Sequence, residues 1–186
     1  MLNELTIIIP THNREKFINR SYSYWKNIGI KFEIFDSSQK INLTKKNYRN
    51  YNYVQGIDFY SKLYLAVSNV NTKYTLIVAD DDFITLNGIN QSLIFLENNS
   101  DFVSAQGLYI DFWYNNNQID LCARNPFARG LYSDLTEEQL NARLQKLMEN
   151  YMHHIYAIHR TEILKESLNI SKRISASAKE INIAIV

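Results

Sequence analysis

The segment LTIIIPTHNREKFINRSYSYWKNIGIKFEIFDSS, residues 5–38, predicts the fold class of this protein. Residues 5–11 form a continuous run of apolar and β-branched side chains closed by a proline and a threonine, which is typical of a strand buried on both faces. Residues 14–28 carry apolar side chains at roughly helical spacing, and Gly29 follows them as a helix C-cap does. Residues 30–38 alternate as a second strand. A strand, a helix and a strand with short connections form a βαβ unit, which implies a parallel sheet.

The rest of the chain continues this alternation. The further elements that the sequence predicts are a helix over residues 57–70, a strand over 74–79, a helix over 86–99, a β-hairpin around 115–117, a helix from 136, and a strand running into a helix over 153–164. The residues expected on the buried face of the first of these helices are Phe59, Leu63, Ala66 and Val67. We therefore predict a single α/β domain over residues 1–186, with a mainly parallel, Rossmann-like central sheet flanked by helices.

Composition excludes several classes of protein. A chain of 186 residues suits one domain with a sizeable core, and its net charge of +1 provides no electrostatic footprint for nucleic acid. Cys122 is the single cysteine, so an internal disulfide and a cysteine-based zinc site are excluded. The N-terminus resembles a first strand and lacks the features of a signal peptide, which favours a cytoplasmic location. The final segment EINIAIV ends within an apolar periodic pattern, so we expect a truncated chain.

Polar residues follow three of the predicted strands. These are Thr11 to Arg14, Asp36, and the acidic triplet Asp80, Asp81 and Asp82. In open α/β sheets, ligands bind beyond the carboxyl ends of the strands, so the three groups share one crevice if the strands are neighbours. Alternate carboxylates suit a hard divalent cation such as Mg²⁺ or Mn²⁺, with substrate phosphates as its other ligands. The alternative is that Asp82 caps the helix that follows.

Three motifs in this order, TIIIPTHNR, IFDSS and YTLIVADDDF, resemble the nucleotide-binding half of a family 2-type glycosyltransferase with the GT-A fold. The resemblance covers roughly the first 100 residues. It implies that residues 1–100 form the nucleotide-binding half and residues 101–186 the acceptor-side half. The chain departs from the family pattern after Asp36, because Ser37, Ser38 and Gln39 stand where another acid and a glycine are usual.

The resemblance also implies roles for individual residues. Those expected at the nucleotide are Pro10, Thr11, Arg14, Asp36, Lys62, Asp80 and Asp81, and those expected at a Mn²⁺ or Mg²⁺ ion are Asp82 and Asp80. Asp36 is expected to hydrogen-bond the nucleobase, and Asp80 to approach the ribose. Lys62 lies in the helix before the acidic triplet, where such enzymes often contact the nucleotide; the alternative is a solvated helix charge.

The implied reaction is transfer of a sugar from a nucleotide-diphosphate donor, with a UDP-sugar favoured, to a saccharide or lipid-linked acceptor. Inversion at the sugar and a part in bacterial surface polysaccharide synthesis are implied by the resemblance alone. Glu180 is the first candidate for the general base, with a solvated helix carboxylate as the alternative reading, and Asp111 is the second candidate. Peripheral association of the protein with the inner face of the membrane is compatible with a cytoplasmic location and a lipid-linked acceptor. The sequence does not determine the oligomeric state, nor which of the four histidines lies in the site.

Two other functions stay open. A sugar-nucleotide nucleotidyltransferase has a related α/β fold, but the first loop of this chain lacks the glycine-rich, basic sequence that holds a triphosphate. A non-catalytic domain that binds a nucleotide sugar, or an interaction module, is the second alternative.

Overall fold

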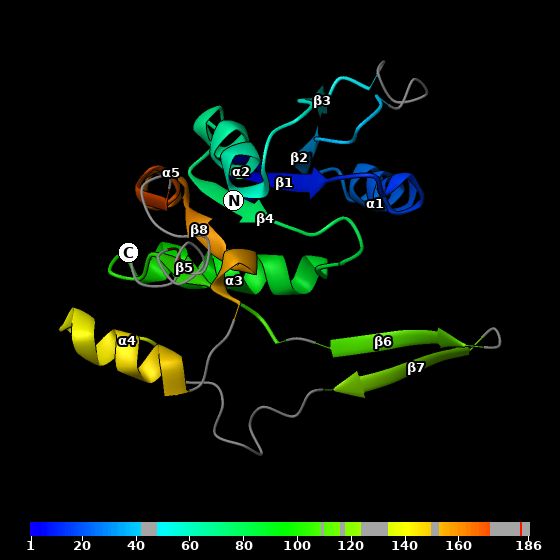
Figure 1. Ribbon diagram of the computed structural model, residues 1–186. Coiled ribbons are helices and arrows are strands. Elements are labelled where there is room, and N and C mark those ends of the chain that lie inside the picture. Colours follow the sequence, from blue (N-terminus) through cyan, green and yellow to red (C-terminus); the bar gives the residue numbers. More distant parts are fainter. Residues whose placement is uncertain are drawn as a thin grey trace. The chain divides into compact units, whose positions relative to one another are not determined.

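The computed structural model describes residues 1–41, 48–108, 110–115, 118–123, 134–149, 153–171 and 183. A six-stranded sheet lies at its centre, in the order β3-β2-β1-β4-β8-β5 (Figure 1). Its strands are β1 (Leu5–Thr11), β2 (Lys31–Asp36), β3 (Tyr51–Tyr53), β4 (Tyr74–Ile77), β5 (Ser104–Ala105) and β8 (Ile158–Arg160). The neighbouring pairs among β3, β2, β1 and β4 are parallel, whereas β8 runs antiparallel to both β4 and β5. The predicted α/β class with a mainly parallel sheet is confirmed.

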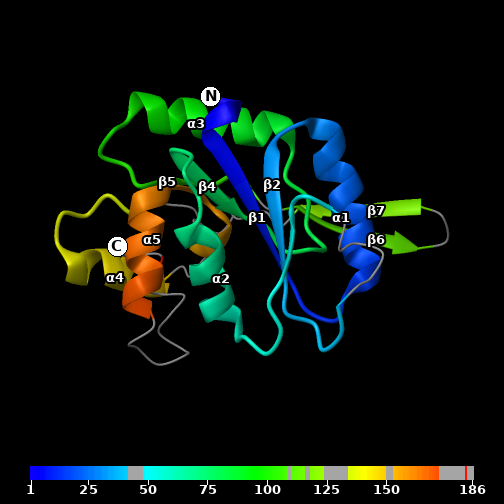
Figure 2. The same ribbon diagram turned by 90° about the horizontal axis from the view of Figure 1, so that it is seen from above.

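The first βαβ unit has the form that the sequence predicts. The helix between β1 and β2 is α1 (Glu15–Ile28), and it ends at Gly29, whose φ of 79° is in the left-handed region. Glycine adopts this conformation without the steric cost that a Cβ atom imposes, so it terminates the helix and turns the chain into β2. Figure 2 shows β2, β1 and β4 side by side.

Helices cover both faces of the sheet. On one face, Leu5, Ile7 and Ile9 of β1 pack in a cluster with residues of α1 and of α3 (Leu86–Asn98). On the other, Ile8 packs in a cluster with residues of α2 (Phe59–Ser68) and α5 (Thr161–Ser171). Side chains of a strand point alternately to its two faces, and both faces of β1 are apolar. The central strand is therefore buried completely, as its sequence predicts.

The buried face of α2 differs from the predicted one at two positions. Leu63, Ala66 and Val67 are buried as expected, but Phe59 is 42% exposed and the buried set includes Lys62 instead. Phe59 is the first residue of the helix, and its ring contacts the ring of the adjacent Tyr60 edge-on. A lysine is rarely buried this deeply unless its ammonium group has hydrogen-bond partners.

The chain divides into two compact units. The first comprises Met1–Gln106, His154–Ala184 and Val186 and contains the sheet, and the second comprises Gly107–His153 and Ile185. The first unit also includes the short 3₁₀ helices η1 (Leu2–Glu4) and η3 (His154–Tyr156). The expected acceptor-side half thus contributes β5, β8 and α5 to the unit that holds the N-terminal strands.

The second unit contains the predicted hairpin and one helix. The hairpin consists of β6 (Ile110–Asn115) and β7 (Gln118–Ala123), with Ile110 opposite Ala123 and Asn115 opposite Gln118. The helix is α4 (Leu140–Glu149). In the described part of the chain, no helix is long and apolar enough to cross a membrane.

Candidate functional site

The carboxyl ends of β2, β1 and β4 lie side by side in the sheet. The register pairs Thr11 with Asp36 across β1 and β2, and Ile8 with Ile77 across β1 and β4. Thr11 is three residues beyond Ile8, and Asp80 is three residues beyond Ile77. The strand order therefore brings the three polar groups predicted from the sequence to one edge, as the rule for open α/β sheets requires.

Asp80 is a buried carboxylate with a partner on each oxygen. Its side chain is 2% exposed, its Oδ2 accepts a hydrogen bond of 2.6 Å from the Thr11 hydroxyl, and its Oδ1 lies 3.1 Å from the Arg14 guanidinium. Burial raises the pKa of Asp80 above its usual value, because it disfavours the charged form, and the contacts with Thr11 and Arg14 oppose this effect. These two residues thus hold Asp80 in one orientation against the end of β1.

Asp36, at the end of β2, is also buried and receives three hydrogen bonds. The backbone N–H of Ser38 donates to Oδ1 at 2.8 Å, and the Ser38 hydroxyl donates to the same oxygen. The hydroxyl of Tyr51, on the edge strand β3, donates to Oδ2. Three donors on one carboxylate fix its orientation at the end of β2.

The loop after β1 is fastened to the loop after β2. His12 Nδ1 lies 2.8 Å from the carbonyl oxygen of Ser37, and the backbone N–H of Asn13 donates to the Ser38 hydroxyl at 2.7 Å. Asn13 has a φ of 55°, and its side-chain oxygen accepts a hydrogen bond of 3.1 Å from the backbone of Gln39. Asparagine tolerates this left-handed conformation better than most residues, so it suits a tight turn here.

Lys62 lies beneath this junction. Its Nζ donates to the carbonyl oxygen of Thr11 at 2.7 Å and to the Ser37 hydroxyl at 2.9 Å. Burial lowers the pKa of Lys62, and the charges of Asp36 and Asp80 oppose that change. The alternative of a solvated helix charge is therefore wrong, because Lys62 is 2% exposed.

Two arginines contact the acidic loop after β4. Arg14 is the N-cap of α1, and Arg20 lies within that helix. Arg14 forms an ion pair with Asp81, which is the largest cause of the raised pKa of Arg14. Arg20 donates to the carbonyl oxygen of Asp81 at 3.2 Å, and its guanidinium lies 5.3 Å from the centre of the Phe17 ring. Arg14 stacks on the same ring at 4.3 Å. These contacts connect the loop to α1.

Asp82 does not cap the following helix. The N-cap of α3 is Thr85, whose hydroxyl accepts a hydrogen bond of 3.2 Å from the backbone of Gly88. Asp82 is exposed, and its backbone N–H closes a turn onto the carbonyl oxygen of Ala79 at 3.1 Å. The structure thus contradicts the capping alternative for the triplet.

A cavity of about 630 Å³ opens beside these strand ends. The residues that line it include Thr11, Asn13, Arg14, Asp36, Ser38 and Tyr51. A volume of this size is in the range of ordinary small-molecule sites. The cavity therefore joins the ends of β1 and β2 in one concave surface.

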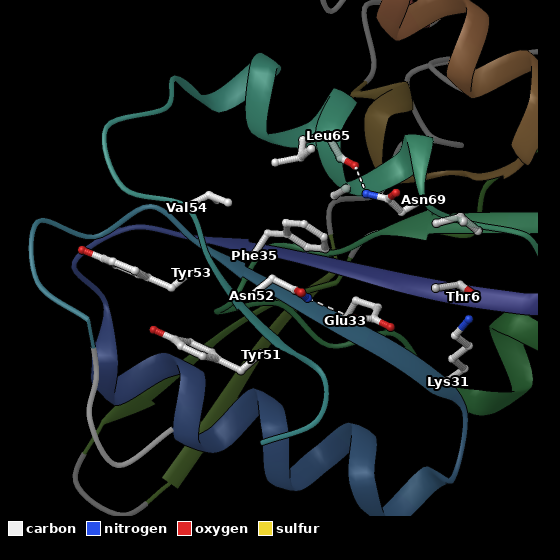
Figure 3. Close-up of a pocket in the computed structure, with 12 residues that line it drawn as sticks. Thr6, Lys31, Glu33, Phe35, Tyr51, Asn52, Tyr53, Val54, Leu65 and Asn69 are labelled. Atoms are coloured by element: carbon white, nitrogen blue, oxygen red, sulfur yellow. Dashed lines mark hydrogen bonds between the residues drawn. The ribbon is translucent and has the colours of Figure 1, made fainter. Parts of the chain in front are cut away.

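A second cavity, of about 490 Å³, lies on the α2 side of the sheet. Phe35, Glu33 and Leu65 are among its lining residues, and the rings of Tyr51 and Tyr53 project away from α2 (Figure 3). Asn52 also lines this cavity, and its side-chain amide donates a hydrogen bond of 3.0 Å to Glu33.

Some predicted site residues lie elsewhere or are not described. Pro10 is buried within β1, opposite Phe35 of β2. Glu180 lies outside the described residues, and Asp111 lies in β6, where its side chain is not described. The general base therefore stays a prediction. Of the histidines, His12 lies in the first loop, whereas His159 is buried in β8 and its Nε2 lies 3.0 Å from the carbonyl oxygen of His154.

Sequence reasoning missed three residues of this edge. They are Tyr51, which holds Asp36, Ser38, which joins the first two loops, and Arg20, which holds the acidic loop. The sequence gives no signal for Tyr51, since thirteen tyrosines are spread along the chain. Ser38 does stand in the segment IFDSS, but only the fold shows which groups its hydroxyl contacts.

Of the carboxylates at these strand ends, Asp82 is the one best suited to bind a hard divalent cation. No cluster of three or more His, Cys, Asp or Glu side chains arranged for a metal occurs among the residues that the structure describes. Magnesium is often bound by one or two carboxylates together with substrate phosphates, so the exposed carboxylate of Asp82 suits it. Asp80 is less suited to direct ligation, because Thr11 and Arg14 occupy its oxygens.

Several proteins of known structure share this fold. S. aureus TarS superposes with a TM-score of 0.54 at 17% identity, over 97% of this chain and 33% of that one. TarS 1–349 in complex with UDP-GlcNAc gives 0.53 at 15% identity, over 97% and 53%. CMP:2-keto-3-deoxy-manno-octonic acid synthetase complexed with CTP gives 0.52 at 12% identity, over 97% and 82%.

These likenesses establish the fold, which is of the GT-A type expected from the sequence. The chain spans 33% of the length of TarS and about half of the 1–349 fragment. No protein-family model matches the sequence, and no curated protein matches it.

Proposed function

We propose that this protein is a metal-dependent glycosyltransferase that takes a sugar from a nucleotide-diphosphate donor, with a UDP-sugar favoured. The observation that carries the proposal is the convergence of Thr11, Asp36 and Asp80 at the carboxyl ends of three neighbouring parallel strands. The cavity beside them and the acidic loop supply the two kinds of surface that a nucleoside diphosphate with a cation requires.

Each group has a role that its surroundings support. Asp36, held by Ser38 and Tyr51, is an acceptor for an N–H of a nucleobase in the cavity. The resemblance assigns the ribose side to Asp80, whose oxygens are held by Thr11 and Arg14, and Asp82 holds Mg²⁺ or Mn²⁺. When bound, the cation supplies charge neutralisation for the departing nucleoside diphosphate. Arg14 keeps the acidic loop in place and adds positive charge beside the phosphates.

The comparisons support this assignment at the level of the fold. TarS is a glycosyltransferase, and one of its structures holds UDP-GlcNAc. Because the chain spans only part of TarS, the acceptor and the reaction of the whole protein are proposals. We propose a saccharide or lipid-linked acceptor, an inverting reaction with Glu180 or Asp111 as base, and a part in bacterial surface polysaccharide synthesis.

The test is calorimetric titration of UDP, with and without Mn²⁺, into the wild type and Asp82→Ala. We expect UDP binding that Mn²⁺ strengthens in the wild type, and loss of the Mn²⁺ effect in the variant. Asp101→Asn, which removes an exposed carboxylate beyond the end of α3, is the matched control and should bind like the wild type. A folded wild type that binds none of UDP, GDP or CDP with Mn²⁺ would overturn the proposal.

A nucleotidyltransferase is the second candidate. The superposition on the CMP:2-keto-3-deoxy-manno-octonic acid synthetase favours it, since the match covers 82% of that chain. Such an enzyme transfers the nucleoside monophosphate of a nucleoside triphosphate to a sugar or sugar phosphate and releases pyrophosphate. Pyrophosphate release from CTP or UTP with sugar acids and sugar phosphates, but no hydrolysis or transfer of UDP-sugars, would establish this function instead.

A further inference from the structure

Lys62 is a buried cation placed behind the candidate site. It projects from α2 into the edge of the sheet, and its two hydrogen bonds reach the carbonyl oxygen of Thr11 and the hydroxyl of Ser37. Thr11 ends β1, and Ser37 follows β2, so one ammonium group connects the two strand ends. The backbone N–H of Ser37 also donates to the Thr11 carbonyl oxygen at 3.1 Å, which makes that oxygen a shared acceptor.

The charge of Lys62 is balanced at a distance. Asp36 and Asp80 both favour the charged form of Lys62. Among the ion pairs of the described residues, none joins Lys62 directly to either acid. Asp36 is held by Ser38 and Tyr51, and Asp80 by Thr11 and Arg14. Lys62 therefore acts on the two carboxylates through the electrostatic potential.

The lining of the cavity separates Lys62 from a ligand. Thr11, Asp36 and Ser38 line the cavity, whereas Lys62 is not among the described residues that do so. Its two hydrogen bonds end on the carbonyl oxygen of Thr11, a residue that lines the cavity, and on the hydroxyl of Ser37. A phosphate in the cavity thus experiences the positive charge without touching it.

We propose that Lys62 is a positioning residue that joins the ends of β1 and β2 and offsets the charge of Asp36 and Asp80, so that an anionic ligand is held above two buried carboxylates without direct contact with the lysine. This inference rests on the proposed function and goes further. It proposes that a residue outside the cavity allows phosphate groups to bind close to two carboxylates. In the absence of Lys62, the two carboxylates would repel the phosphates of a nucleotide.

The test compares ligands of increasing charge on variants of Lys62. Uridine, UMP and UDP are titrated at fixed pH, ionic strength and Mn²⁺ concentration into the wild type, Lys62→Met, Lys62→Gln and Lys62→Arg. The neutral glutamine retains the N–H donors, and the arginine retains the charge. Lys73→Met is the matched control, because it removes one exposed lysine at the start of β4, the opposite end of that strand from Asp80. Thermal unfolding of each variant tests whether it is folded.

We expect both neutral variants to weaken UDP binding roughly tenfold, UMP binding less and uridine binding least, because the lost attraction scales with ligand charge. Lys62→Arg should keep most of the affinity for UDP, and Lys73→Met should bind all three ligands like the wild type.

Three results would overturn the inference. Equal losses for all three ligands would make Lys62 a structural residue only. Wild-type affinity in Lys62→Gln would show that its charge is dispensable, and a loss confined to UDP would indicate direct contact with the terminal phosphate. If the wild type itself binds neither UMP nor UDP, the proposed function fails, and that result is distinct from the other three.

Discussion

The hydroxyl of Thr11 donates a hydrogen bond of 2.6 Å to the buried carboxylate of Asp80, across 69 positions of sequence. This contact joins the ends of β1 and β4 at the edge where Asp36 and the acidic loop also lie. It shows how the fold holds a buried carboxylate: its oxygens are paired with Thr11 of a neighbouring strand and with Arg14.

Thr11→Val retains the shape of the side chain and removes this hydrogen bond. We expect a loss of about 1–3 kcal/mol in the free energy of unfolding, because a buried acceptor loses its partner. The pKa of Asp80 should rise further, since the hydrogen bond from Thr11 lowers it. Urea denaturation at pH 7 measures the first effect. Thr11→Ser keeps the hydroxyl and should lose clearly less stability; an equal loss in both variants would contradict the explanation.

Tyr51→Phe removes the hydroxyl that donates to Asp36. A hydrogen bond to a charged group contributes about 1.5–3 kcal/mol, so the variant should be destabilised by an amount in that range. Nucleotide binding should weaken as well, because Asp36 loses a contact that orients it.

Tyr53→Phe is the matched control for this prediction. Tyr53 lies on the same strand, but its hydroxyl donates to the neutral carbonyl oxygen of Ser38 at 3.0 Å. We expect a loss of about 0.5–1.5 kcal/mol there and a smaller effect on binding. Urea denaturation and calorimetry of both variants test the difference, which must favour Tyr51 if the charge of Asp36 matters.

His159 should make the protein sensitive to acid. Its side chain is 3% exposed, and burial lowers its pKa from 6.5 to about 4. Because the folded state favours the neutral ring, the stabilising contribution is complete above pH 6.5 and is lost as the pH falls towards 4. The shift corresponds to about 3 kcal/mol at most.

Denaturation in urea at pH 7, 6, 5 and 4.5 measures this effect. The variant His159→Gln has no ionisable group at this position, and its amide can still donate to the carbonyl oxygen of His154. Its stability should therefore fall less steeply between pH 6.5 and 4.5 than that of the wild type. Identical slopes for the two proteins would show that His159 does not cause the acid sensitivity.

Arg160 fastens the end of α3 to β8. Its guanidinium donates to the carbonyl oxygens of Leu96 at 2.7 Å, Asn99 at 3.1 Å and Phe102 at 2.9 Å. The last carbonyls of a helix lack partners within the helix, so this side chain acts as a cap. Arg160→Met should lower the free energy of unfolding by about 2–3 kcal/mol.

Lys165→Met, on α5, is the comparison for Arg160. Lys165 pairs with Glu162 at the surface, and an exposed pair of this kind contributes about 0.5 kcal/mol or less. Chemical denaturation of the two variants should separate them clearly. A loss in Arg160→Met as small as that in Lys165→Met would show that the carbonyls find other donors.

The sequence was sufficient for several local elements of the first unit, although it did not predict the short strands β3 and β5. The apolar run of β1, Gly29 after α1 and the acids after β4 each depend on neighbours within a few positions, and the structure has them where the patterns predict. Local patterns could not predict that β8 lies between β4 and β5 and runs antiparallel to both. Its position depends on pairing with β4 and β5, which are far from it in the sequence.

The sequence by itself determined the order of the longer strands and helices of the first unit and placed polar residues at the ends of β1, β2 and β4, because hydrophobic periodicity and helix-ending residues act locally. Only the tertiary structure decided that Thr11 meets Asp80, that Tyr51 holds Asp36, and that Lys62 is buried. These contacts depend on strand order and register, which are set by packing between residues far apart in the chain. Local pattern thus supplies the chemical groups, and long-range packing arranges them into a site.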